Sequence, residues 1–432
     1  MKKTRTAIIG AGAMGLACAY DLLKAGHEVH IFEDDDRVGG MSASFDFEGL
    51  NIERYYHFVC GPDYPLFEMM KELSIADKLK WNETKMGFFY NGKLYKWGNP
   101  LYLLTFPEAD MITKLRYGLH VFLASKRSDW KNLDGVNALS WIRNFVGVKG
   151  YNIFWKPLFD LKFYELANNI SAAWIWTRIK RVALSRKNIF TEKMGYIEGG
   201  SDTLFQALVQ EIEKMGGKIH LKNRVKKIAI KDKELQVLEY DGGIERYDNV
   251  VSTIPLPLVP TIMPELPASL IKQYQDVRNI GVVCVVFKLK NRFTENFWLN
   301  INDSTIEIPG MIEYSNLNPM QPNILYIPFY LDKSHPKYNR SDESFIEEVL
   351  EYAKKINPAF SSDWVLGHKV HRYEYAQPVC TPNYLNNIPD IQTEINGLYI
   401  GDTSYYYPED RSISESIRLG REMAGAVVQN KK

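Results

Sequence analysis

Residues 6–15 read Thr-Ala-Ile-Ile-Gly-Ala-Gly-Ala-Met-Gly, an apolar run that leads into the pattern Gly10-x-Gly12-x-x-Gly15. Residues 16–23 continue with helical spacing, so the glycines stand between a strand and a helix. Gly10 permits the tight turn, Gly12 lets a pyrophosphate approach the backbone, and Gly15 lets the helix pack close to the strand. The stretch therefore predicts the first strand, turn and helix of a dinucleotide-binding fold.

The residues around this turn carry two further features of dinucleotide binding. The helix begins at about Ala13 and Met14, and its N-terminus offers free N–H groups and a positive dipole end to phosphates. A second short strand, residues 27–32, ends in Glu33, whose carboxylate can accept hydrogen bonds from both ribose hydroxyls of an adenosine. A carboxylate there disfavours the 2′-phosphate of NADP. A glycine turn that only closes a βα unit would leave Glu33 unexplained.

The next segment, Arg37-Val-Gly39-Gly40-Met41, favours FAD over NAD. Its paired glycines follow the ribose-binding acid, where they allow backbone contact with the pyrophosphate and flavin side of the cofactor. Arg37 can pair with a phosphate oxygen. The alternative is an ordinary Gly-Gly loop with a solvated arginine.

The C-terminal segment adds a third piece of a cofactor site. A short strand ends in Gly401-Asp402, and a helix begins near Ser412, capped by Asp410 or Ser412. With these pieces the chain resembles the FAD-dependent amine oxidase and protoporphyrinogen oxidase superfamily, which also includes phytoene desaturases and, more distantly, UDP-galactopyranose mutases. The resemblance implies that Gly401 and Asp402 contact the ribityl-phosphate region. It also implies that the N–H groups of Ser412 and Ile413 lie near the flavin pyrimidine carbonyl.

Two middle segments fit the same resemblance. The glycine pair Gly199-Gly200 precedes a helix, and residues 220–225 resemble the family's next strand, whose valine, here Val225, touches the adenine through its backbone. Residues 248–255, which include Thr253, resemble the strand that closes the FAD domain. The resemblance covers nearly the whole chain and is specific at the FAD-binding pieces.

The expected fold class is α/β, with two interleaved domains. A Rossmann-like FAD-binding domain of the glutathione-reductase type would draw on residues 1–70, 190–260 and 385–432. An α+β substrate-binding domain, built on a mixed or antiparallel sheet plus helices, would take residues 71–189 and 261–384. Residues 101–190 are predicted to be largely helical, and residues 280–332 and 364–377 to form strands whose open face covers the flavin.

Composition excludes several classes of protein. The 432 residues hold 53 basic and 52 acidic side chains, a net charge of +1, which argues against nucleic-acid binding by bulk charge. The four cysteines are far apart and form no C-x-x-C pair, so neither a disulfide framework nor a zinc site is expected. No histidine spacing suggests a metal. The early first strand leaves no room for a signal peptide, and no run approaches a membrane span, so a cytoplasmic location is predicted.

Residues 111–127 offer an alternative to that location, which is contact with a membrane surface. They place apolar side chains among lysines and arginines, as a basic amphipathic helix on a membrane surface would. A helix packed on the substrate domain is the favoured interpretation. The oligomeric state is not predicted.

Candidate catalytic residues come from two segments. Tyr56 and His57 follow the glycine-pair motif, in a segment that passes near the flavin in the family, and a histidine that only bonds the backbone near FAD is the alternative. Tyr407 ends a run of three tyrosines before the flavin helix, where it could line a substrate wall or pack under the cofactor domain. Lys156, Lys162 and Tyr164 belong to a segment that often borders the substrate in relatives.

Three functions follow from the resemblance. The leading one is an FAD-dependent oxidoreductase that takes hydride from a C–N or C–C bond of a small-molecule substrate to flavin N5. The second is a non-redox flavoenzyme like the nucleotide-sugar mutases, motivated by His57 and the tyrosines. The third is a protein that holds FAD structurally. The sequence does not name the substrate.

Overall fold

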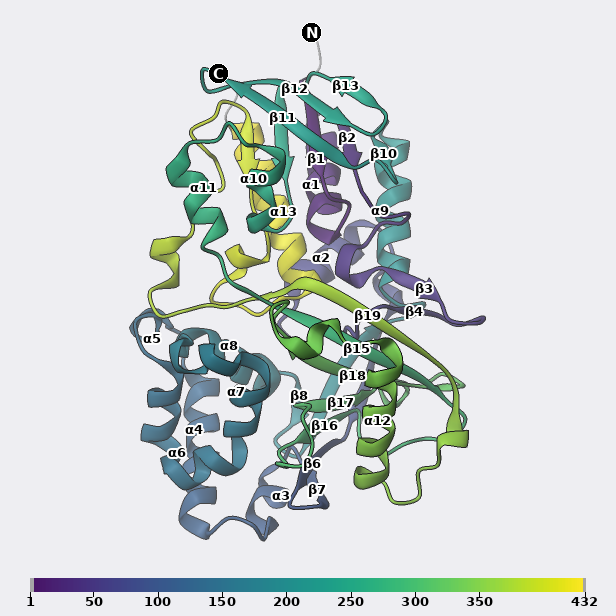
Figure 1. Ribbon diagram of the computed structural model, residues 1–432, viewed down its shortest axis with the longest axis vertical. Helices are drawn as coiled ribbons and strands as arrows, with labels where there is room; N and C mark the ends of the chain where they lie inside the picture. The colour runs from purple at the N-terminus through teal and green to yellow at the C-terminus, as the bar shows by residue number, and fades with distance from the viewer. Residues whose placement is uncertain (1–3, 430–432) are drawn as a thin grey trace.

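The computed structural model describes residues 4–429 of the chain. Its upper half in Figure 1 is built on a five-stranded sheet in the order β10-β2-β1-β14-β20, in which every neighbouring pair is parallel. The strands come from distant parts of the sequence: β1 (Arg5–Ile9), β2 (Glu28–Phe32), β10 (Lys218–His220), β14 (Asn249–Ser252) and β20 (Leu398–Ile400). This interleaved parallel sheet confirms the predicted Rossmann-like fold.

The sheet is covered on both faces, as the alternation along β1 requires. Ile8 packs on one side, and its neighbours Ala7 and Ile9 pack on the other. The Ile8 side is covered by helices α1 (Ala13–Lys24), α2 (Tyr64–Glu72), α9 (Ser201–Lys214) and α13 (Ile413–Gln429). The opposite side is covered by strands β11 (Val225–Lys231), β12 (Glu234–Tyr240) and β13 (Gly243–Glu245) with helices α10 (Val259–Ile262) and α11 (Ala268–Gln275).

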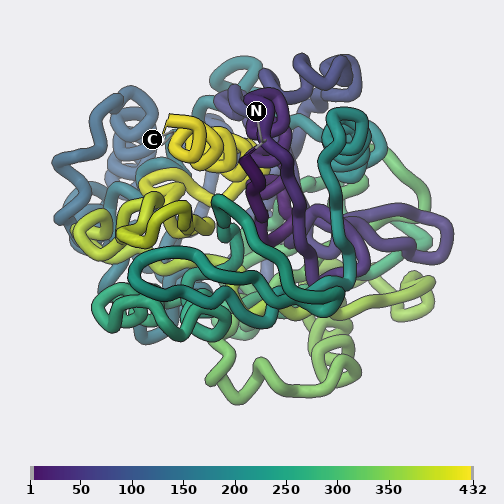
Figure 2. The backbone as a smooth tube through the Cα atoms, turned by 90° about the horizontal axis from the view of Figure 1, so that it is seen from above, coloured from purple at the N-terminus to yellow at the C-terminus, as the bar shows by residue number. Residues whose placement is uncertain are grey.

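Small residues bring the first and last helices together. A Cβ on Gly15 would lie 2.0 Å from the carbonyl oxygen of Gly10, which confirms the predicted close packing of α1 on its strand. A Cβ on Gly420 would lie 2.3 Å from the carbonyl oxygen of Met14, so α13 crosses α1 at its first turns. Figure 2 shows the two helices side by side. Both helix N-termini therefore point into the same part of the molecule.

The lower half contains a seven-stranded sheet in the order β19-β15-β18-β17-β16-β6-β7. It is mixed, because β16 pairs with β6 in parallel and the other pairs are antiparallel. The strands are β6 (Met86–Tyr90), β7 (Lys93–Trp97), β15 (Asn279–Leu289), β16 (Trp298–Ile301), β17 (Gly310–Glu313), β18 (Asn323–Leu331) and β19 (Val365–Pro378). A mixed sheet with strands in both predicted ranges was expected from the sequence.

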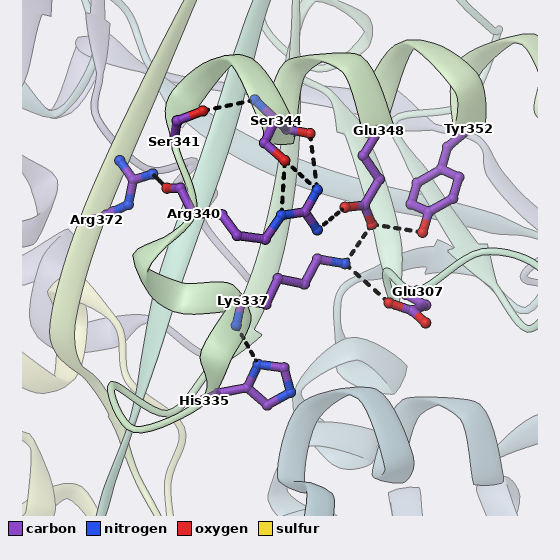
Figure 3. A network of polar contacts seen from close by, with 9 residues as sticks. All are labelled: Glu307, His335, Lys337, Arg340, Ser341, Ser344, Glu348, Tyr352 and Arg372. Carbon is purple, nitrogen blue, oxygen red and sulfur yellow. Dashed lines mark hydrogen bonds and ion pairs between the residues drawn. The ribbon is translucent and has the colours of Figure 1, made fainter.

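One face of this sheet packs on helix α12 (Asp342–Ile356), which a polar network fastens to the turn before it (Figure 3). The buried ammonium of Lys337 lies between the carboxylates of Glu348 and Glu307, 3.1 Å from the latter. Tyr352 also donates to Glu348. Burial alone would raise the pKa of Glu348, but the hydrogen bonds from Lys337 and Tyr352 lower it. The other face of the seven-stranded sheet carries Cys284 and Tyr330 and lies toward the upper half.

Six helices complete the lower half and confirm the predicted helical region: α3 (Pro100–Thr105), α4 (Met111–Lys126), α5 (Lys131–Asp134), α6 (Ala138–Phe154), α7 (Lys156–Phe163) and α8 (Ala172–Leu184). Two small sheets join the halves: β3 (Ser44–Asp46) with β4 (Asn51–Glu53), and β5 (Leu79–Thr84) with β8 (Arg186–Asn188) and β9 (Thr191–Ile197).

One detail differs from expectation, and another bears on the predicted domain boundary. Residues 220–225 are not a strand: β10 ends at His220, Lys222 takes a left-handed φ of 52°, and β11 begins only at Val225. The chain turns there because it passes from the parallel sheet to the antiparallel one. The pairing of β5 with β9 also crosses the domain boundary placed at residue 190. The proposed division of the chain into two domains stays a prediction.

All four cysteines, Cys18, Cys60, Cys284 and Cys380, are buried and free. Across residues 4–429, no helix combines the length and the apolar character that crossing a membrane requires. No group of three or more histidine, cysteine or acidic side chains in that range could hold a metal ion.

Candidate active site

A cavity of about 1110 Å³ lies where the two halves meet. This exceeds the roughly 300–1,000 Å³ of sites for drug-sized ligands, as a site for a dinucleotide and a substrate should. One end is lined by most of the residues that the sequence assigns to the cofactor: Gly10, Gly12, Ala13, Met14, Glu33, Gly39, Gly40, Met41, Thr253, Asp402, Ser412 and Ile413. The fold thus brings the three separated cofactor segments to one place.

The N-terminus of α1 is shaped to receive phosphate. Gly12 is its N-cap, with φ −70° and ψ 176°, and no side chain caps the helix. A Cβ on Gly12 would meet nothing within 4 Å, so the missing side chain leaves open space beside the first helical N–H groups. Uncapped N–H groups beside open space are what a pyrophosphate needs. The residues at this end therefore fit FAD.

Glu33 stands at the end of β2, as predicted, and is held in place by backbone. Its two carboxylate oxygens accept from the N–H groups of Ala11 at 2.8 Å and Asp35 at 2.9 Å. Arg54, which sequence reasoning missed, also lines the cavity and pairs with Asp35. Arg37 does not line the cavity. It pairs with its neighbour Asp36 and donates to the Ser44 carbonyl, so its expected phosphate contact is not supported by its position.

The residues that follow β14 and β20 and the start of helix α13 form the rest of the cofactor end of the cavity. The carboxylate of Asp402 accepts from the N–H groups of Leu256 and Ser404, both at 2.8 Å, and Thr253 donates to the Ile9 carbonyl. Burial raises the pKa of Asp402. Ser412 caps α13, since its hydroxyl accepts from the Glu415 N–H at 3.1 Å. Asp410, the other expected cap, is paired with Arg178 instead.

Three of the residues predicted to bind the cofactor lie outside the lining of the cavity. Gly15 packs against the Gly10 carbonyl in the turn, Gly401 faces Met423, and Val225 begins β11. None of them is part of the cavity lining. Their contact with FAD stays a prediction.

Tyr56 and His57 both line the cavity, between its two ends. The hydroxyls of Tyr56 and Tyr330 are 3.1 Å apart, which ties the cofactor-binding segment to the seven-stranded sheet. His57 Nε2 shares a hydrogen bond with the Ser42 hydroxyl at 3.1 Å, and its Nδ1 is 3.7 Å from a Glu53 carboxylate oxygen. His57 thus bonds the segment after the glycine pair, and contact of Tyr56 with a substrate stays a prediction.

Tyr407 is not brought to this cavity. Its hydroxyl lies 2.7 Å from that of Ser171 and also bonds Asp134, and its ring packs against Trp130 and Tyr384. The residue is buried among these groups because the turn before α13 packs on α5 and α8. Its position corresponds to the packing alternative rather than to a substrate wall.

A cluster of basic side chains lies near Tyr330 in the structure. Lys162 Nζ lies 4.5 Å from the centre of the Tyr330 ring, with Arg411 above the same ring at 5.9 Å. Arg178 pairs with Asp410 at 2.8 Å. All four charged residues line the cavity. Burial and, secondarily, Arg178 lower the pKa of Lys162 well below its usual value. Only the resemblance had pointed to Lys162, and no spacing in the sequence links it to residues 178 and 411.

The far end of the cavity is largely apolar, with Asn99, Ser125 and Arg186 among its polar lining residues. It is formed by α3, α4, α7, α8 and the turn after β8, which contribute Leu103, Tyr117, Val121, Phe122, Leu158, Ile175, Ile179, Val182 and Ile189.

One carboxyl in the cavity wall should make stability depend on pH. Glu192 on β9 is 4% exposed and accepts from the Thr84 hydroxyl, and burial raises its pKa from 4.5 to about 7. Between these values only the unfolded chain ionises Glu192, so stability falls as pH rises through this window. We expect Glu192→Gln to unfold like the wild type at pH 4 and to be about 3 kcal/mol more stable above pH 7.

Urea unfolding at a series of pH values measures this difference. The exposed Glu198→Gln, at the end of the same strand, is the matched control and should change stability by less than about 0.5 kcal/mol. An unchanged pH slope in Glu192→Gln would show that another group causes it.

The comparisons with known proteins agree with this site. The cofactor segments and the cavity they line define an FAD-dependent oxidoreductase. The chain belongs to the family of flavin containing amine oxidoreductases, whose model matches residues 15–426.

Among curated proteins, the 15-cis-phytoene desaturase of Synechococcus elongatus is 26% identical over 391 residues, which cover 82% of this chain and 80% of the relative. The zeta-carotene desaturase of a Synechocystis strain is 27% identical over 294 residues, covering 60% and 59% of the two chains.

Solved structures share the fold. A putative protoporphyrinogen oxidase from Exiguobacterium superposes with a TM-score of 0.78 at 17% identity, covering all of both chains. A reduced UDP-galactopyranose mutase gives 0.77 at 16% identity, covering 99% of this chain and 96% of the other. At these identities the likeness concerns the fold alone.

Proposed function

We propose that this enzyme oxidises a carbon–carbon bond of an uncharged, largely apolar substrate to a double bond. The observation that carries the proposal is the single cavity, lined at one end by the cofactor segments and at the other by apolar side chains of four helices. An apolar wall favours a substrate without charges, because burying an unpaired charge is costly. The names of the curated relatives, desaturases of phytoene and zeta-carotene, support a carbon–carbon bond.

The charges in the cavity argue against a C–N bond. Amines are protonated near neutral pH, and two of the groups between the two ends of the cavity are themselves cationic, Arg178 and Arg411. The carboxylate among them, Asp410, is already paired with Arg178. A protonated amine would meet like charge at this point.

The reaction removes a hydride from one carbon and a proton from its neighbour. FAD held by the cofactor segments would supply the hydride acceptor, and dioxygen or another acceptor would take up the two electrons. In this proposal Lys162 takes the proton, which is supported by the position of its amine in the cavity beside Tyr330 and by its lowered pKa, since the neutral form accepts a proton. The paired hydroxyls of Tyr56 and Tyr330 would fix the substrate beside it.

The nucleotide-sugar mutase alternative has less support. The family is one of oxidoreductases, and the far end of the cavity offers apolar side chains where a sugar nucleotide needs hydrogen-bonding partners.

Anaerobic reduction of the bound flavin tests the proposal. Uncharged polyenes and alkylamines of similar length are mixed with the holoenzyme in detergent micelles, and loss of the visible flavin band is followed. We expect polyenes of suitable length to bleach the flavin and amines to leave it oxidised. Bleaching by amines alone would overturn the proposal.

A further inference from the structure

Helix α4 buries polar residues and exposes apolar ones, which is the reverse of an ordinary surface helix. Its buried residues include the polar Thr113, Lys114 and His120, whereas Ile112 is 71% exposed and Leu115 is 59% exposed. Lys114 Nζ donates to the Leu104 carbonyl at 2.8 Å, and His120 packs between Trp141 and Phe145. A surface helix usually buries its apolar face. The apolar face of α4 is therefore free for another partner.

Neighbouring segments extend this face. Helix α3 and the stretch 184–190 lie next to each other, since Arg186 bonds the Gly98 carbonyl and Asn99 contacts the Phe190 carbonyl at 3.5 Å. We call the exposed large apolar side chains of these segments and α4 the apolar cap: Leu101, Leu104, Met111, Ile112, Leu115, Leu119, Phe122, Leu123, Leu184, Ile189 and Phe190. These are eleven of the eighteen exposed large apolar side chains within residues 4–429, so they are concentrated rather than scattered.

The apolar cap surrounds the mouth of the active-site cavity. Phe122 and Ile189 are exposed and also line the cavity, as do the half-buried Val121 and Val182. An apolar path thus runs from the cap to the cavity interior. In Figure 1 the cap segments α3 and α4 belong to the lower half, away from the parallel sheet at the top.

The charges around the cap are mostly positive; Asp110, just before Met111, is an exception and is paired with Lys149. Segments 100–106, 111–126 and 178–190 contain no aspartate or glutamate, whereas the whole chain is nearly neutral. Exposed or half-exposed cations border the cap: Arg116, Lys126, Lys180, Arg186 and Lys187. Lys187 is paired with Glu83, whereas Arg116 and Arg186 donate to backbone carbonyls and so keep their net positive charge. A basic border around an apolar surface complements an anionic lipid headgroup layer.

We propose that the apolar cap docks on an anionic lipid membrane, with the cavity mouth facing the bilayer. The apolar side chains enter the boundary between headgroups and acyl chains, and the basic border binds anionic headgroups. Delivery of an apolar substrate from lipid to the cavity rests on the proposed function. Docking itself does not, and its test uses no substrate.

Flotation of the holoenzyme with vesicles tests the docking. We expect the wild type to bind vesicles of phosphatidylcholine with phosphatidylglycerol, and to bind phosphatidylcholine alone or high-salt samples more weakly. The double variant Ile112→Glu with Leu115→Glu should bind the anionic vesicles at least about 100-fold more weakly. Neither residue lines the cavity, so the variant should keep its flavin.

The matched control replaces an exposed isoleucine and leucine elsewhere, Ile244→Glu with Leu366→Glu, and should bind vesicles like the wild type. Three results would overturn the proposal: no binding of the wild type to either vesicle, equal loss in the control variant, or self-association of the wild type through the cap without vesicle binding. Because binding is measured without substrate, failure here leaves the flavin-reduction test of the proposed function unaffected.

Discussion

Gly12→Val should yield a folded protein that has lost its flavin. The backbone of Gly12 has φ −70° and ψ 176°, a conformation that valine adopts readily, and the new side chain would meet no protein atom within 4 Å of its Cβ. It would instead fill the space beside the first N–H groups of α1, where the pyrophosphate is expected. We expect at least about 100-fold weaker FAD binding, measured by flavin content after purification and by titration of the apoprotein.

The apoprotein supplies the necessary comparison. Valine at an N-cap costs about 1 kcal/mol, so the variant should unfold only slightly below wild-type apoprotein. Gly425→Ala in α13, where a Cβ also meets nothing within 4 Å, should keep wild-type flavin content. A Gly12→Val protein that purifies with a full complement of flavin would place the pyrophosphate elsewhere.

Lys162→Met should slow substrate-dependent reduction of the flavin about 100- to 1,000-fold, the usual effect of losing a general base. Methionine fills a similar volume beside Tyr330 but cannot accept a proton. In the wild type, the rate should rise with pH through the lowered pKa of Lys162, because only the neutral amine accepts the proton. In the variant this rise should disappear. Anaerobic stopped-flow measurements at a series of pH values report both quantities.

Two substitutions separate proton transfer from packing or charge. Lys156→Met lies on the same helix, but Lys156 is exposed and paired with Asp160, so this variant should react at the wild-type rate. Lys162→Arg keeps a positive charge but does not lose its proton, so flavin reduction should be as slow in this variant as in Lys162→Met. A Lys162→Met enzyme with wild-type rate and pH profile would assign the proton to another group.

The cofactor end could be read from the sequence because its requirements are local. A tight turn, a close backbone approach and an acid at a strand end each need a particular residue at a fixed spacing, and Gly10, Gly12 and Glu33 meet them. The parallel sheet followed from the same segments. Arg37 has the expected spacing, but its side chain turns to Asp36, so its contact with a phosphate stays a prediction. Arg54 occupies the cavity instead.

The substrate end could not be read because it depends on contacts between distant residues. Lys162, Arg178 and Arg411 meet only when α7, α8 and the start of α13 pack around the same cavity. Tyr407 shows the converse, since its place in the sequence is next to the flavin helix but its hydroxyl is engaged by Ser171. The apolar character of residues 111–127 was visible, but which side of α4 is exposed required the fold.

The mass of the substrate after a single anaerobic turnover tests the central claim most directly. Holoenzyme is mixed without oxygen with an uncharged polyene that bleaches its flavin, and the extracted organic phase is analysed by mass spectrometry. We expect each reduced flavin to be matched by one product molecule that has lost two hydrogen atoms and gained a double bond. A product of unchanged mass with the flavin still oxidised, or bleaching without such a product, would contradict it.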